Sequence, residues 1–241
     1  MHPTEVPPMI PLSTPSAALF TLLVLLVAAA IAAAIGARLP EDDDAAARRW
    51  RTTATAGAMV WLILSALPAV TGLLAAPGPW MVVFVAVFLG SAVALAASPA
   101  GARAARRPLW ALLAFQVFRL PLEMLLHHWH IHGSVPIQMT WSGQNLDVLS
   151  GLLAVPFLIA RRDPPRPWAW AVLAVQLALL ANVMRIALTS APTPMRRFMD
   201  DPTLLLPLYW PSTWIVPVCV AGALLGHLVT LRHLYTNPPA P

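Results

Sequence analysis

The chain has 241 residues, of which 59% are hydrophobic and 10% charged. A soluble domain of this size could not bury so much apolar surface, so the composition excludes that class and indicates an integral membrane protein. The formal charge of +5 comes from arginine without any lysine, in segments that flank apolar runs, and it indicates membrane orientation, not a nucleic-acid partner.

Seven apolar runs follow one another along the chain, and most are long enough to cross about 30 Å of hydrocarbon as helices. They cover 16–37, 54–76, 80–98, 109–127, 145–160, 168–190 and 208–231. The fifth run is short and contains Pro156, so we expect it to be tilted or kinked. The first run lacks a basic segment before it, which favours a retained helix over a cleaved signal peptide.

The expected fold is therefore all-α: a polytopic integral membrane protein with seven transmembrane helices in a single domain over 16–234. An extended N-terminal tail covers 1–15, and a C-terminal tail covers 235–241. Arginine without lysine, together with abundant Ala and Pro, is typical of a GC-rich bacterial genome. We accordingly expect a multi-pass protein of the bacterial inner membrane.

Arginines occupy alternate connections between the runs. They gather in 38–51, 99–108 and 161–166 and near the C-terminus, whereas 77–79 and 127–144 have no Lys or Arg. The positive-inside rule then places the N-terminus outside and the C-terminus in the cytoplasm. Only Arg196 and Arg197 oppose this orientation.

The side chains that are most unfavourable to bury lie in the fourth, fifth and sixth runs. In the fourth run Gln116, Arg119, Glu123 and His127 are spaced by 3, 4 and 4 residues, so they share one helical face. A charge at the centre of a bilayer is unfavourable by at least about 2.5 kcal/mol, so such residues normally face the bundle interior and pair.

In the predicted orientation, these polar groups fall in the outer half of the membrane on all three helices. We therefore predict a periplasm-facing polar pocket among the fourth, fifth and sixth helices. Its predicted ligand-binding residues are Arg119, Glu123, His127, Asn145, Asp147, Asn182 and Arg185. Two arginines and two carboxylates give no net charge if all are ionised, which favours a small polar or zwitterionic ligand over a purely anionic one.

A structural alternative stands beside this pocket. Arg119 with Glu123, and Arg185 with Asp147, would form closed ion pairs that only fix helix packing, because buried pairs are weak indicators of function. For His227, near the cytoplasmic end of the seventh helix, we expect a side chain that reaches the interface or bonds a carbonyl.

Four histidines, at 127, 128, 130 and 132, lie where the fourth helix leaves the membrane. His127 and His130, with Glu123, form a potential two-histidine, one-carboxylate metal set. The order differs from H-E-x-x-H, and Gly133 and Pro136 are expected to end the helix. Interfacial anchoring is favoured over a metal site or a pH-responsive rim, and neither metal nor cofactor is expected.

The segment WSGQNLDVLSGLLAVPFLIARR, a turn, and then LLANVMRIAL resembles the core of the exosortase and archaeosortase membrane transpeptidases over about 141–188. In that family a Ser-Gly motif follows a catalytic Cys and precedes an Asn-x-x-Arg-Ile helix and a later His. Asn182, Arg185 and Ile186 match this motif, but no cysteine precedes the Ser-Gly pairs. The chain also resembles bacterial multi-pass membrane proteins of unknown activity.

Three classes of function remain open. The first is binding, sensing or transport of a small polar ligand. The second is an intramembrane enzyme on an exosortase-like scaffold, with Glu123 or His127 as general base and Arg185 stabilising an oxyanion. The third is a structural or accessory subunit that contacts the lipid bilayer and a membrane-protein partner or a second copy of the chain.

Overall fold

The protein is all-helical in the part of the chain that the structure describes, which is 10–76, 78–193, 195–199 and 202–237 of a computed structural model. The all-α prediction is therefore confirmed for these residues. The predicted tails lie partly outside them, at 1–9 and 238–241. The first helix begins at Thr14 and the last ends at Thr236, so both helices extend slightly beyond the predicted membrane domain.

Six helical stretches are long and apolar enough to cross a membrane. They are α1 (Thr14–Gly36), α2 (Asp44–Val70), α3 (Trp80–Ala97), a fourth helix Leu109–Ile131, α8 (Arg166–Ser190) and a last helix Ser212–Thr236. The fourth helix consists of α5 (Leu109–Ala114), η2 (Phe115–Phe118) and α6 (Arg119–Ile131). The last helix consists of η5 (Ser212–Ile215), η6 (Val216–Val220) and α9 (Ala221–Thr236). Shorter elements are η1 (Leu73–Ala75), α4 (Pro99–Ala104), η3 (Ile137–Met139), α7 (Val148–Ala160) and η4 (Leu206–Leu208).

The fifth predicted helix differs most from expectation. Instead of beginning near 145, α7 begins at Val148 and has 13 residues, or about 20 Å of helix, which is less than the bilayer core. Asn145 and Asp147 precede it in a non-helical segment and are both buried. Polar backbone at membrane depth is tolerated where protein surrounds it, as it does here.

Prolines explain two departures from α geometry. Pro121 has no N–H for the carbonyl one turn earlier, and the preceding residues Phe115–Phe118 tighten into a 3₁₀ turn directly before Arg119. Pro217 lies within the π-helical turn Val216–Val220. Such π turns inside helices are frequent at functional sites.

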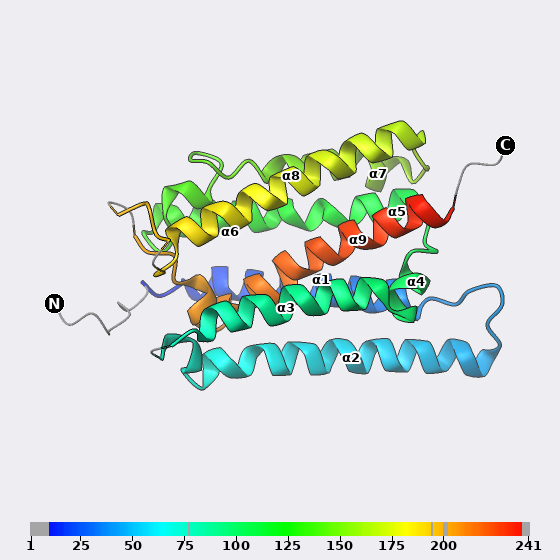
Figure 1. The fold of residues 1–241 in the computed structure, drawn as a ribbon, viewed down its shortest axis with the longest axis horizontal. Coiled ribbons are helices and arrows are strands. Elements are labelled where there is room, and N and C mark those ends of the chain that lie inside the picture. Colours follow the sequence, from blue (N-terminus) through cyan, green and yellow to red (C-terminus); the bar gives the residue numbers. More distant parts are fainter. Residues whose placement is uncertain (1–9, 77, 194, 200–201, 238–241) are drawn as a thin grey trace.

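The connections gather at two ends of the bundle (Figure 1). One end, here called the His-rich end, carries the start of α1, the connection that begins at His132, and residues 191–193, 195–199 and 202–211 (Figure 1). Trp129 Nε1 donates to Ser16 Oγ at this end, at 2.9 Å. The opposite, Arg-rich end carries the connection 37–43, α4 and the end of α9 (Figure 1).

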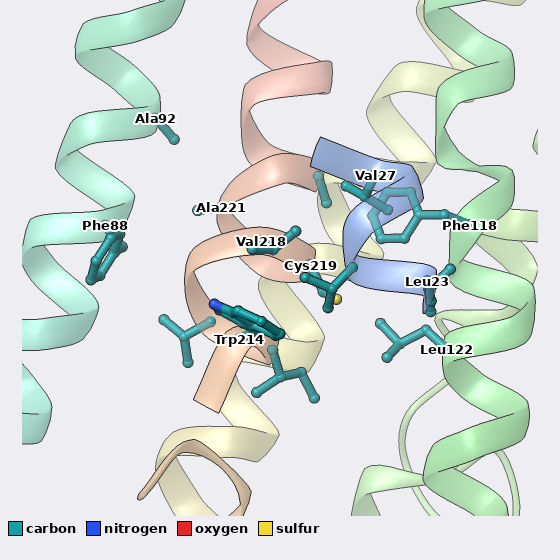
Figure 2. Close-up of a cluster of buried hydrophobic side chains, with 14 of the residues drawn as sticks. Leu23, Val27, Phe88, Ala92, Phe118, Leu122, Trp214, Val218, Cys219 and Ala221 are labelled. Atoms are coloured by element: carbon teal, nitrogen blue, oxygen red, sulfur yellow. The ribbon is translucent and has the colours of Figure 1, made fainter. Parts of the chain in front are cut away.

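The last helix is central: 72% of the residues in its apolar stretch are buried inside the protein. In α2, which packs mainly on α1, the corresponding share is 6%. Side chains of α1, α3 and the fourth helix meet the last helix around Val218 and Cys219 (Figure 2). Trp214 Nε1 donates to the Leu62 carbonyl at 3.1 Å and thereby joins α2 to this core. The last helix therefore forms one wall of the space between α3, α6 and α8.

Candidate functional site

A buried ion pair joins the fourth helix to the start of α7. Arg119 begins α6 directly after the 3₁₀ turn, and its Nη1 lies 2.8 Å from Asp147 Oδ1. Ser150, one turn into α7, donates from Oγ to the same Asp147 oxygen at 2.7 Å and accepts from Arg119 Nη1 at 3.2 Å. Arg119 and Asp147 are each 2% exposed. A guanidinium and a carboxylate are thus held in fixed positions far from either end of the bundle.

Glu123 lies one turn further along α6 and has no cation partner among the described residues. Both of its oxygens accept from Asn145 Nδ2 at 3.0 Å, and the same amide also donates to the Met139 carbonyl. Asn145 Oδ1 accepts from the Asp147 backbone N–H at 3.0 Å. The side chain of Asn145 therefore holds the non-helical segment against α6 and links Glu123 to the ion pair.

These three ionisable residues line a cavity of about 260 Å³ between α3, α6, α8 and the π turn of the last helix. The remaining walls are almost entirely apolar and include Cys219. Among the described residues only Nη1 of Arg119 has a hydrogen-bond partner, so Nε and Nη2 are left for another group. The three residues thus form part of the cavity wall, while each of them is at most 2% exposed.

The seven predicted site residues separate into three groups. Arg119, Glu123, Asn145 and Asp147 form the connected network described above. Asn182 and Arg185 lie on another side of α8, where Arg185 is exposed and donates to Gln144 Oε1 at 3.0 Å. Asn182 Nδ2 donates to the Gln144 carbonyl at 2.8 Å, and neither of the two lines the cavity.

The predicted ion pairs had the wrong partners. Asp147 pairs with Arg119 and not with Arg185, because the segment before α7 folds into the bundle and carries its carboxylate to the level of Arg119, near the middle of the fourth helix. Glu123 contacts the amide of Asn145 in place of a guanidinium. Arg185, free of Asp147, reaches Asn182 Oδ1 at 2.9 Å.

His127 does not join the network either. Its ring stacks on Trp141, with ring centroids 4.2 Å apart and an interplanar angle of 20°. His130 Nδ1 lies 3.0 Å from the Val135 carbonyl, and His132 Nδ1 lies 2.8 Å from the His128 carbonyl. Within the described chain no group of three or more His, Cys, Asp or Glu side chains is arranged to hold a metal ion.

Two buried polar residues were missed by sequence reasoning. Gln176 of α8 is fully buried and donates from Nε2 to the Ser150 carbonyl at 3.0 Å. His227 was expected to reach the interface or to bond a carbonyl. It is instead 1% exposed, and its Nδ1 lies 3.4 Å from the side-chain nitrogen Nε2 of Gln116. The spacing of Gln116, Arg119 and Glu123 places them on one helical face. That spacing was the only feature of the sequence that indicated a buried partner for Gln116, which the structure gives as His227.

Comparisons with known proteins add no relative. No protein-family model matches the chain, and no curated protein and no solved structure matches it. Of the residues that carry the exosortase resemblance, Arg185 is exposed and Ile186 is fully buried.

Proposed function

We propose that the chain is a multi-pass protein of the bacterial inner membrane that binds, senses or transports a small ligand with a charged or zwitterionic group. In this proposal α7 and the buried segment before it make a seventh crossing. The N-terminus is outside and the C-terminus is cytoplasmic, so the cavity lies toward the periplasmic side.

The observation that carries the proposal is the position of three buried ionisable residues in the wall of a cavity. Taking a carboxylate or a guanidinium out of water is unfavourable by several kcal/mol unless partners compensate, and a purely structural pair is expected to be packed shut. Arg119, Glu123 and Asp147 instead lie in the wall of a cavity of about 260 Å³. Intramembrane ionisable residues of this kind mark functional sites by default.

The positions of the arginines support the orientation. Arg103 of α4 donates to the carbonyls of Ile35 and Ala37, and Arg232 of α9 donates to those of Ala96 and Ser98. Arginines from connections far apart in sequence therefore converge on the Arg-rich end. An end rich in arginine is typical of the cytoplasmic side.

Ligand-induced stabilisation of the purified chain tests this function. The thermal unfolding midpoint is measured in a non-ionic detergent with amino acids, small acids, amines and single-chain amphiphiles. A ligand at about one hundred times its Kd stabilises the folded state by about 2.7 kcal/mol, so a specific compound raises the midpoint. Glu123→Gln keeps the side-chain shape and removes the carboxyl group beside the cavity.

Glu41→Gln is the matched control, because Glu41 is exposed at the Arg-rich end and pairs there with Arg106. We expect the ligand-induced rise in midpoint in wild type and in Glu41→Gln, and a much smaller rise in Glu123→Gln. Equal responses in all three proteins, or no response to any compound, contradict the proposed function.

A further inference from the structure

We propose that the ligand is an amphiphile with one apolar chain and an ammonium group, and that it enters from the bilayer between α3 and α8. The inference rests on the proposed function and specifies the class of ligand that the site takes.

The walls of the cavity predict the apolar chain. Apart from the three ionisable residues and Thr193, its lining consists of Ala, Val, Leu, Ile, Met and Pro side chains and Cys219. A small hydrophilic ligand would satisfy the ionisable groups and leave these walls facing water, which is unfavourable in proportion to their area. Ligand sites generally combine mostly apolar walls with a few placed polar groups, and the apolar part of the ligand fills the walls.

The mouth of the cavity faces the side of the bundle. Val82 of α3 and Leu188 of α8 both line the cavity and are 61% and 40% exposed at the molecular surface. Both helices are long apolar spans, and they lie on either side of the last helix (Figure 1). Residues exposed on the flank of such spans contact lipid, so the mouth opens toward the hydrocarbon of the bilayer.

The end of the cavity nearest the connections is lined mainly by buried leucines. Leu204, Leu206 and Leu208 line it from the segment before the last helix, and each is at most 4% exposed. Pro207 lies between two of them and also lines the cavity. Pro192 also lines the cavity from this end and is exposed, so the leucines narrow this end without sealing it. The lateral mouth is the route that places the chain of an amphiphile against lipid.

Charge predicts the ammonium group. Of the residues that line the cavity, Arg119 contributes one positive charge and Asp147 and Glu123 contribute two negative charges, which leaves one excess negative charge when all are ionised. Arg185 was the second positive charge of the predicted pocket, which made its net charge zero, but Arg185 lies outside the cavity. A buried carboxyl group without a cation takes up a proton and becomes neutral, and Glu123 has only the amide of Asn145 beside it. It ionises favourably when a cation binds next to it. A ligand ammonium beside Glu123 supplies the missing charge.

The depth of these groups fits the same ligand. Arg119 lies ten residues after Leu109, about 15 Å along a helix of 23 residues, so the ionisable groups sit near the middle of the span. An ammonium bound there draws the head of the amphiphile inward, and its chain follows the apolar wall to the mouth. A zwitterionic head can also place an anionic group against Nε and Nη2 of Arg119, in the fork geometry that guanidinium favours.

Binding to the full chain in nanodiscs of phosphatidylglycerol, which has no ammonium group, tests the inference. Four probes separate head from chain: a long-chain alkylamine, lysophosphatidylethanolamine, lysophosphatidylglycerol with the same chain, and glycerophosphoethanolamine without a chain. We expect the two chain-bearing amines to bind, and the other two to bind at least about tenfold more weakly. Tighter binding of lysophosphatidylethanolamine than of the alkylamine identifies a phospholipid, and the reverse order identifies a simple amine.

Two exposed neighbours on α3 give a matched pair of variants. Val82 lines the cavity mouth, whereas Val83 is 46% exposed and does not line it. A tryptophan at either position faces lipid, so both variants are expected to fold. Val82→Trp should weaken binding of the chain-bearing amines at least about tenfold, and Val83→Trp should leave it unchanged.

The possible results separate this inference from the proposed function. If glycerophosphoethanolamine binds as well as the chain-bearing amines, and Val82→Trp has no effect, the lateral amphiphile is ruled out while the polar site survives. If lysophosphatidylglycerol binds as tightly as lysophosphatidylethanolamine, the ammonium requirement is wrong. If no probe binds and no compound stabilises the wild type, both proposals fail.

Discussion

At the scale of single residues, the pair of Arg119 and Asp147 illustrates how burial decides the energetic role of a charge. Asp147→Ala would leave a buried guanidinium with only the hydroxyl of Ser150. Removing one partner of a buried pair destabilises by about 3–5 kcal/mol, because the remaining charge is uncompensated. We expect a loss of this size in the free energy of unfolding, measured by titration with a denaturing detergent in mixed micelles.

Asp44→Ala is the control for this prediction. Asp44 pairs with Arg38 at 2.7 Å, but the two side chains are 72% and 62% exposed. Exposed pairs contribute about 0–1 kcal/mol, so this change should be nearly neutral. If the two variants lose similar stability, the pair of Arg119 and Asp147 is solvated and the cavity is not a membrane-embedded site.

A second charge at the Arg-rich end gives a pH-dependent prediction. Arg103 donates to both oxygens of Asp42, and this hydrogen bonding lowers the pKa of the Asp42 carboxyl from 3.8 to about 2. Because the folded-state pKa is depressed, the stabilisation is complete above about pH 4 and is lost as the pH falls through about 2. The thermal unfolding midpoint of wild type should therefore fall over this window relative to Asp42→Asn.

Asp44→Asn, which changes an exposed carboxyl of the same end, provides the comparison for that titration. Its midpoint should follow the wild-type pH dependence. A wild-type curve parallel to that of Asp42→Asn between about pH 4 and pH 2 would show that the contact with Arg103 does not couple to stability.

The sequence identified Arg119, Glu123 and Asp147 because a buried charge is so unfavourable that its presence in an apolar run is informative. The same argument failed for Arg185, which satisfies its donors at an exposed face beside Gln144. Ser150 carries no such signal, because an isolated serine in an apolar run is common and its role depends on the partner that the fold supplies.

At the scale of elements, the contact of α7 with the fourth helix positions Asp147 against Arg119. Gly151 allows this contact: a Cβ there would lie 2.8 Å from the Leu120 backbone nitrogen and 2.6 Å from its Cγ. We expect Gly151→Ala to push α7 away, to reduce the free energy of unfolding by about 1–3 kcal/mol and to weaken ligand binding. Unfolding in mixed micelles and the thermal-shift response measure the two effects.

Gly90→Ala in α3 is the matched control, because nothing lies within 4 Å of the Cβ that it would add. In open space the same change favours the helix by roughly 0.5–1 kcal/mol. If Gly151→Ala is as well tolerated as Gly90→Ala, the contact between α7 and Leu120 is not tight, and the network does not depend on the position of α7.

The long apolar spans were predictable at this scale because their length and composition are set by the bilayer. The late start of α7 was not predictable from the sequence, because it results from side-chain contacts of the segment before the helix. Asn145 donates to the Met139 carbonyl and to Glu123 in place of capping a helix. Gly143 lies in a turn of the same segment, where a Cβ would collide with the Ile137 carbonyl oxygen.

At the scale of the whole molecule, the two ends differ in charge and the cavity lies nearer one of them. The Arg-rich end carries Arg103, Arg106, Arg166 and Arg232 in contacts that tie separate connections together. The cavity lies toward the other end and is lined there by residues of the segment before the last helix. The side of the membrane that the cavity faces therefore follows from which end is cytoplasmic.

Labelling of single cysteines in intact cells decides this orientation. Ser142 lies exposed in the connection at the His-rich end, and Asp43 is exposed in the connection at the Arg-rich end. Because basic connections are retained in the cytoplasm, a membrane-impermeant thiol reagent should label Ser142→Cys from outside and Asp43→Cys only after lysis. The native Cys219 is buried, so wild type should stay unlabelled and serves as the background control. The reverse pattern would place the cavity toward the cytoplasm, and the ligand would then be sought in the inner leaflet.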